Sequence, residues 1–108
     1  MTLVATKPRP ADPARMRNAL VEMRAALDAL PDHHDFTDPE AFAAAFEVTL
    51  DELRTRFRAL DRSARITQTE EFCTIAGFGH VTTSRLGFIG ALEKWLRRIG
   101  RAVGEDQA

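Results

Sequence analysis

The sequence predicts an all-α protein, a single compact bundle of about five helices that pack in an orthogonal arrangement. Apolar residues recur at spacings of three and four in several segments, which is the period of a helix with one buried face. Residues that cap helix N-termini precede these segments. A chain of 108 residues with 44% apolar and 29% charged residues is that of one globular domain.

The first helix is expected to begin at Asp12-Pro13, a capping residue followed by proline at the first helical position, and to end at Pro31. Its apolar residues fall at alternating spacings of four and three. They are Met16, Leu20, Met23, Leu27 and Leu30. Two interpretations are open: an ordinary face turned to the core, or a coiled-coil seam that binds a second copy or a helical partner.

Two helices are expected in the next segment. Asp38-Pro39 repeats the cap and predicts a short helix through Phe46. Residues 49–52 (TLDE) form a capping box and predict the start of another helix, in which the Thr and Glu satisfy each other's free amides. That helix would carry Leu53 and Phe57 on its apolar face.

Residues 67–70 (TQTE) match the capping box again and predict a short helix that ends in a turn at Gly77 and Gly79. The alternative for residues 66–81 is a short hairpin, because Ile, Thr and Val favour strands. We prefer the helix because the alternation of apolar and polar residues is poor.

The last helix is expected to follow Thr82, Thr83 and Ser84, with Leu86, Leu92, Leu96 and Ile99 among the residues of its apolar face. Gly90 inside this helix costs about 1 kcal/mol relative to alanine, which predicts a close approach by a neighbouring element. The domain would span residues 12–103. Flexible segments are expected at 1–11 and 104–108.

No catalytic machinery, cofactor or metal site is expected. Cys73 is interpreted as a small buried residue rather than a nucleophile activated by His80. Residues 32–35 (DHHD) are interpreted as a solvated loop. The chain has no apolar stretch long enough for a membrane span and no secretory signal, and a lone cysteine is typical of the cytoplasm.

The segment from Gln68 to Trp95 resembles the helix-turn-helix of bacterial transcription factors. Cys73 would take the small position of the first helix, Gly77 the turn, and Leu86 an inward position of the recognition helix. The resemblance implies orthogonal packing of two helices and contact with duplex DNA.

The distribution of charge supports a function in binding nucleic acid. The net charge is −1, but the charged residues of 79–103 are basic apart from Glu93. We therefore expect a non-enzymatic regulatory or DNA-handling protein, with phosphate contacts from a set of basic and hydroxyl side chains. This set comprises Thr82, Thr83, Arg85, Lys94, Arg97, Arg98 and Arg101. The alternative is a helical protein-interaction module, such as an adaptor, that uses the 16–30 seam or the glycine-bearing last helix.

Overall fold

The computed structural model describes residues 12–104 and shows an α+β fold, so the expectation of an all-α bundle is wrong. Three helices and a short 3-10 turn accompany a three-stranded antiparallel sheet in the order β1-β2-β3. The elements are α1 (Pro13–Asp28), η1 (His33–Asp35), α2 (Pro39–Arg58), β1 (Arg65–Gln68), β2 (Cys73–Gly77), β3 (His80–Ser84) and α3 (Gly87–Ala102). The segments 1–11 and 105–108, where flexibility is expected, lie outside the described residues.

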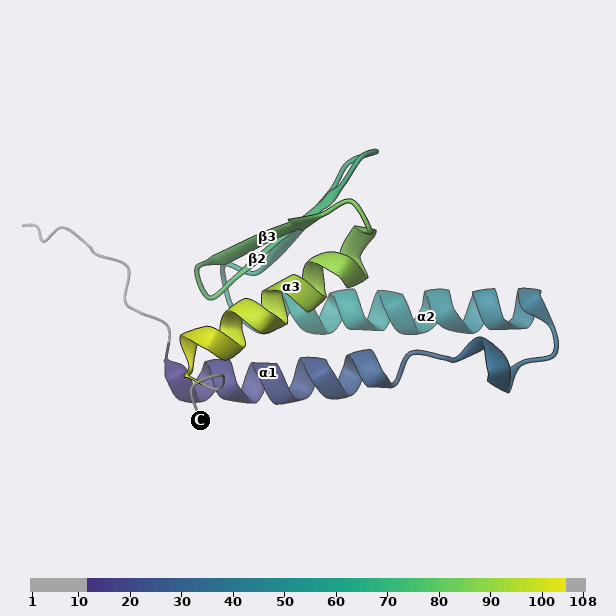
Figure 1. The fold of residues 1–108 in the computed structure, drawn as a ribbon, viewed down its shortest axis with the longest axis horizontal. Coiled ribbons are helices and arrows are strands. Elements are labelled where there is room, and N and C mark those ends of the chain that lie inside the picture. The colour runs from purple at the N-terminus through teal and green to yellow at the C-terminus, as the bar shows by residue number, and fades with distance from the viewer. Residues whose placement is uncertain (1–11, 105–108) are drawn as a thin grey trace, which may run out of the picture.

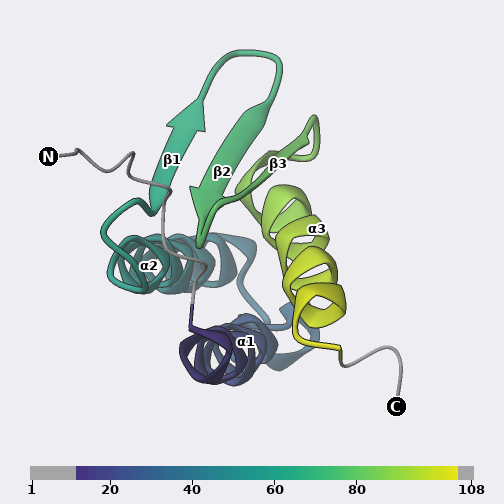
Figure 2. The same cartoon turned by 90° about the vertical axis from the view of Figure 1, so that its left-hand side faces the viewer.

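The helices lie on one side of the sheet. Helices α2 and α3 face the sheet, and α1 packs against both of them on the side away from it (Figures 1 and 2). Side chains alternate between the two faces of a strand. In β2 the buried side is formed by Cys73, Ile75 and Gly77, whereas Thr74 and Ala76 are half-exposed on the other side. The outer face of the sheet is therefore not covered by a helix of the described chain.

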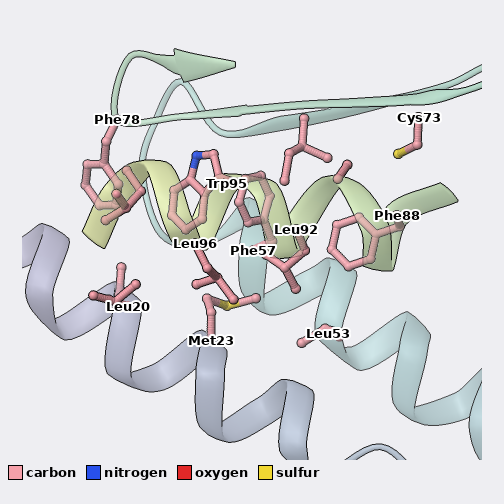
Figure 3. Packing of buried hydrophobic residues seen from close by; sticks show 14 of the residues in the cluster. Leu20, Met23, Leu53, Phe57, Cys73, Phe78, Phe88, Leu92, Trp95 and Leu96 are labelled. Atoms are coloured by element: carbon pink, nitrogen blue, oxygen red, sulfur yellow. The ribbon is translucent and has the colours of Figure 1, made fainter. Parts of the chain in front are cut away.

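The core is centred on Trp95 of α3, which lies between the sheet and α2 (Figure 3). The Trp95 ring meets the Phe57 ring edge-on, with centroids 5.0 Å apart. Its indole Nε1 donates a hydrogen bond of 3.2 Å to the carbonyl of Gly77. A Cβ at Gly77 would lie 3.2 Å from the Trp95 ring and 3.3 Å from the Phe57 ring, so a larger residue would crowd both. The hydrogen bond and the close packing between Gly77 and Trp95 hold β2 against α3.

The segment expected to be a short helix forms the β1–β2 and β2–β3 hairpins instead. Thr69 does act as a cap, but of a turn: its hydroxyl accepts a hydrogen bond of 3.1 Å from the amide of Phe72. In the second hairpin Gly77 pairs with His80, and both central residues have positive φ, 52° at Phe78 and 80° at Gly79. Such angles belong to the two-residue turn that suits the twist of paired strands. The hairpin interpretation of residues 66–81 is therefore correct.

The two helices expected between residues 38 and 60 are one continuous helix, α2. The Asp38 cap is confirmed, since its carboxylate accepts a 3.0 Å hydrogen bond from the amide of Glu40. Thr49 lies inside the helix, where its hydroxyl donates to the carbonyl of Ala45 at 3.0 Å. It therefore starts no new helix. The expected apolar face is confirmed, because Leu53 and Phe57 are fully buried.

The apolar stripe of α1 belongs to the protein's own core. Met16, Leu20 and Met23 are buried against α2 and α3, and Leu27 and Leu30 are half-buried at the edge of the same cluster. The structure places this stripe where an ordinary core-facing helix would have it.

The expected close approach at Gly90 is present and lies within the molecule. A Cβ on Gly90 would be 2.9 Å from Cβ of Leu86 and closer still to the hydroxyl oxygen of Ser84, so the end of β3 rests on the helix backbone. Gly87 starts α3 with a φ of 84°, a conformation that glycine adopts without strain. Leu86 precedes the helix and is 85% exposed, so its expected place on the apolar face is wrong.

Candidate nucleic-acid interface

Six of the seven predicted binding residues lie around one hollow, which we call the basic hollow. Lys94, Arg97, Arg98 and Arg101 follow one another at spacings of three and one along α3, so they share one side of that helix. The facing wall is β3. The hollow is lined by Val81, Thr82, Thr83, Lys94, Arg97, Arg98 and Arg101.

Hydrogen bonds hold α3 against β3 and fix the walls of the basic hollow. Lys94 donates from Nζ to the carbonyl of Thr83 at 2.8 Å, and Arg98 donates to the carbonyl of Val81 at 2.6 Å. Thr82 donates from its hydroxyl to the carbonyl of Ala91 at 2.8 Å. Because β3 is an edge strand, the two basic side chains also occupy carbonyls that would otherwise be open to another strand.

The charged side chains that line the basic hollow are all cationic. Within residues 12–104 no acidic residue lines it, and Lys94, Arg97 and Arg98 form no ion pair with a carboxylate. Lysine has three N–H donors and arginine has five, so one backbone contact leaves Lys94 and Arg98 with donors to spare. Burial, and the neighbouring charge of Arg98, lower the pKa of His80 below its usual 6.5, so this imidazole tends to be neutral.

Arg85, the seventh predicted residue, lies in an adjoining depression, which we call the apolar hollow. Its lining residues are Phe72, Thr83, Ser84, Arg85, Leu86 and Lys94. Thr83 and Lys94 line both hollows, so the two surfaces are continuous. Sequence reasoning missed Phe72 and Leu86 as surface residues, because both fit the apolar faces of the expected helices. No signal in the sequence would have placed them there.

Cys73 and His80 do not form a nucleophile and base pair. Cys73 pairs with Ser84 and His80 with Gly77, so the two residues are four positions apart along the hairpin, or about 13 Å. Cys73 is fully buried, and burial raises the pKa of its thiol. Both features disfavour the reactive thiolate.

The loop after α1 does bring possible metal ligands together. Donor atoms of Asp32, His33 and His34 lie within 4.8 Å of one another, and all three residues are exposed. The carboxylate of Asp32 is also used as a cap, accepting from the amide of His34 at 3.0 Å. A structural zinc site takes four protein ligands, and this set offers three among the described residues.

The helix-turn-helix arrangement is not formed by the residues that suggested it. Cys73 and Gly77 belong to strand β2, so a hairpin rather than a helix precedes α3. The basic residues therefore lie beside a strand edge. None of the helices within residues 12–104 has both the length and the apolar character that crossing a membrane requires. The chain matches no family model, and no curated protein or solved structure is significantly similar to it.

Proposed function

We propose that this protein is a non-enzymatic, cytoplasmic nucleic-acid-binding protein that contacts the phosphate backbone through the basic hollow. The observation that carries the proposal is the gathering of four cationic side chains and two threonines in one hollow, which no acidic residue of the described part of the chain lines. Lysine and arginine contacts to phosphate supply most of the sequence-independent affinity for nucleic acid. The buried, unpaired Cys73 supports a reducing compartment.

The cost of this arrangement to the free protein supports a ligand. On α3, Lys94 and Arg98 are four residues apart. Like charges at this spacing destabilise a helix by about 0.2–0.5 kcal/mol. A bound phosphate would neutralise this pair.

The size of the basic hollow fits a short stretch of backbone. Lys94 to Arg101 spans seven residues of helix, or about 10 Å. Phosphates follow one another at about 3.4 Å along the axis of each strand of a duplex, so roughly three would lie beside this stretch. Three or four contacts correspond to a slope of log affinity against log salt of about −2 to −4.

The alternative of a helical protein-interaction module has less support. Its two expected surfaces were the stripe of α1 and the glycine-bearing helix α3. Met16, Leu20 and Met23 are buried in the core, and Gly90 is covered by Ser84. The residues on which this alternative depends are therefore largely used in the protein's own packing.

Fluorescence anisotropy with labelled oligonucleotides, single-stranded and duplex, tests the proposal. The wild-type protein should bind at about 50 mM salt and lose affinity linearly on a log–log plot as salt rises. Arg97→Gln/Arg98→Gln/Arg101→Gln should weaken binding to every oligonucleotide. It should also flatten the slope by about two to three units.

The matched control replaces three exposed arginines that line neither hollow, Arg17, Arg58 and Arg62, with glutamine. It changes the net charge by the same amount and should leave most of the affinity and the slope. Circular dichroism of both triple variants checks that each is folded. Equal loss of binding in the two variants, or no binding by the wild type, would refute a specific role for the basic hollow.

A further inference from the structure

The basic hollow continues into the apolar hollow around the end of β3. Lys94 stands at the boundary, since it lines both and its Nζ is held by the carbonyl of Thr83. An extended ligand that follows the cationic side of α3 therefore meets Phe72 and Leu86 next. The surface therefore combines cationic side chains that can bind anions with apolar side chains that can contact an apolar group.

Among the described residues, Leu86 is the most exposed large apolar residue. The residue is 85% exposed, compared with 68% for Val21 and 60% for Val48. A single exposed apolar residue needs no explanation by itself. Leu86, however, lines one hollow together with the half-exposed Phe72 and with Arg85. An aromatic ring and a planar cation are the two groups on which unpaired nucleobases stack.

We propose that the ligand is single-stranded nucleic acid, with one unstacked base seated against Phe72 and Leu86 while the neighbouring phosphates follow the basic hollow. This inference rests on the proposed function and specifies its substrate class. The faces of bases in a duplex are covered by their neighbours, so a duplex could use the basic hollow but not fill the apolar one. Lys94 at the boundary would meet the phosphate next to the seated base.

The test compares three ligands of equal length by anisotropy: a labelled oligothymidine, an abasic oligomer with the same phosphates, and a duplex. Stacking of one base should make oligothymidine bind about 5- to 140-fold more tightly than the abasic oligomer. Oligothymidine should also bind more tightly than the duplex.

Leu86→Ser should reduce the ratio of the two single-stranded affinities toward one and leave the affinity for the abasic oligomer unchanged. The high exposure of Leu86 means that this change removes little packing. Phe72→Leu keeps an apolar side chain but removes the ring, so it should reduce the same ratio. Val48→Ser is the control, because Val48 is also exposed and lines neither hollow.

The outcomes separate the two proposals. Equal affinity for oligothymidine and the abasic oligomer, or a preference for the duplex, would refute the binding of a base by Phe72 and Leu86. It would not contradict phosphate binding by the basic hollow. Absence of binding to all three ligands would overturn both. Vesicles of anionic phospholipid provide the remaining comparison: binding to them that exceeds binding to oligothymidine and depends on Leu86 would assign the surface to a membrane instead.

Discussion

Replacing Gly90 with alanine tests how closely β3 rests on α3. In an exposed helix the change would stabilise the protein by about 1 kcal/mol. Here the new methyl group would be 2.9 Å from Cβ of Leu86 and nearer still to the hydroxyl of Ser84, which is buried and has little room to move. Overpacking of this kind typically costs about 1–3 kcal/mol. Displacing Ser84 would also break the 3.0 Å hydrogen bond from the Leu86 amide, worth about 0.5–1.5 kcal/mol.

The expected net effect of Gly90→Ala is a loss of roughly 0.5–3.5 kcal/mol in the free energy of unfolding, once the helix propensity is subtracted. Chemical denaturation of the wild type, Gly90→Ala, Ser84→Ala and the double variant measures it. Removing the Ser84 oxygen should relieve part of the clash, so the two changes should couple by roughly 0.5–3 kcal/mol. A Gly90→Ala protein as stable as the wild type, with no coupling to Ser84, would refute the close approach.

Two further predictions concern the core and the hairpin. Leu20→Glu/Leu27→Glu should unfold the protein, because Leu20 is 1% exposed and lies in the core. If circular dichroism and light scattering instead show a folded monomer, the α1 stripe is an intermolecular contact. The pKa of His80 is lowered, so its imidazole takes up a proton less readily in the folded state than in the unfolded chain. The contribution of His80 to stability is therefore fully present above pH 6.5 and is lost as the pH falls through 6.5 toward the pKa of the folded state. Thermal melts from about pH 7.5 to 5.5 should therefore show a smaller decline for His80→Gln than for the wild type, and identical declines would contradict the shift.

The helices could be predicted from the sequence wherever two independent signals agreed. Asp12 and Asp38 each precede a proline and then apolar residues at helical spacing, and both cap helices in the structure. The first residue of α3 could not be predicted as precisely, because Gly87 has a positive φ and the pattern of side chains does not indicate this backbone conformation.

The sheet could not be predicted because its two main signals were ambiguous. A threonine hydroxyl satisfies the free amides of a turn by the same chemistry that it uses at a helix N-terminus, and Thr69 does so for Phe72. The buried face of β2 contains Gly77 beside Cys73 and Ile75, and the outer face contains Ala76 beside Thr74, so one residue on each face weakens the alternation of apolar and polar residues. The contacts that define β2 come from Trp95 and Phe57, which are distant in sequence.

The gathering of the basic residues on one side of α3 could be predicted although the fold was not, because it depends only on local structure. Whether Lys94, Arg97, Arg98 and Arg101 share one side depends only on residues 94–101 being helical, which they are. The resemblance to a helix-turn-helix required residues 68–77 to be helical as well, but this segment contains the β1–β2 turn and strand β2. The gathering of charge therefore does not depend on the wrong part of the expected fold.

Structural roles account for part of this charge but not for its arrangement. Covering the edge of β3 requires Lys94 and Arg98, whose donors reach the carbonyls of Thr83 and Val81. The C-terminal end of a helix favours cations in its last turn, which suits Arg101. Neither effect requires Arg97 to line the same hollow, or requires that no acidic residue among those the structure describes lines it. An anionic ligand would account for both, and the salt dependence of binding distinguishes it from edge protection because only a ligand releases counterions.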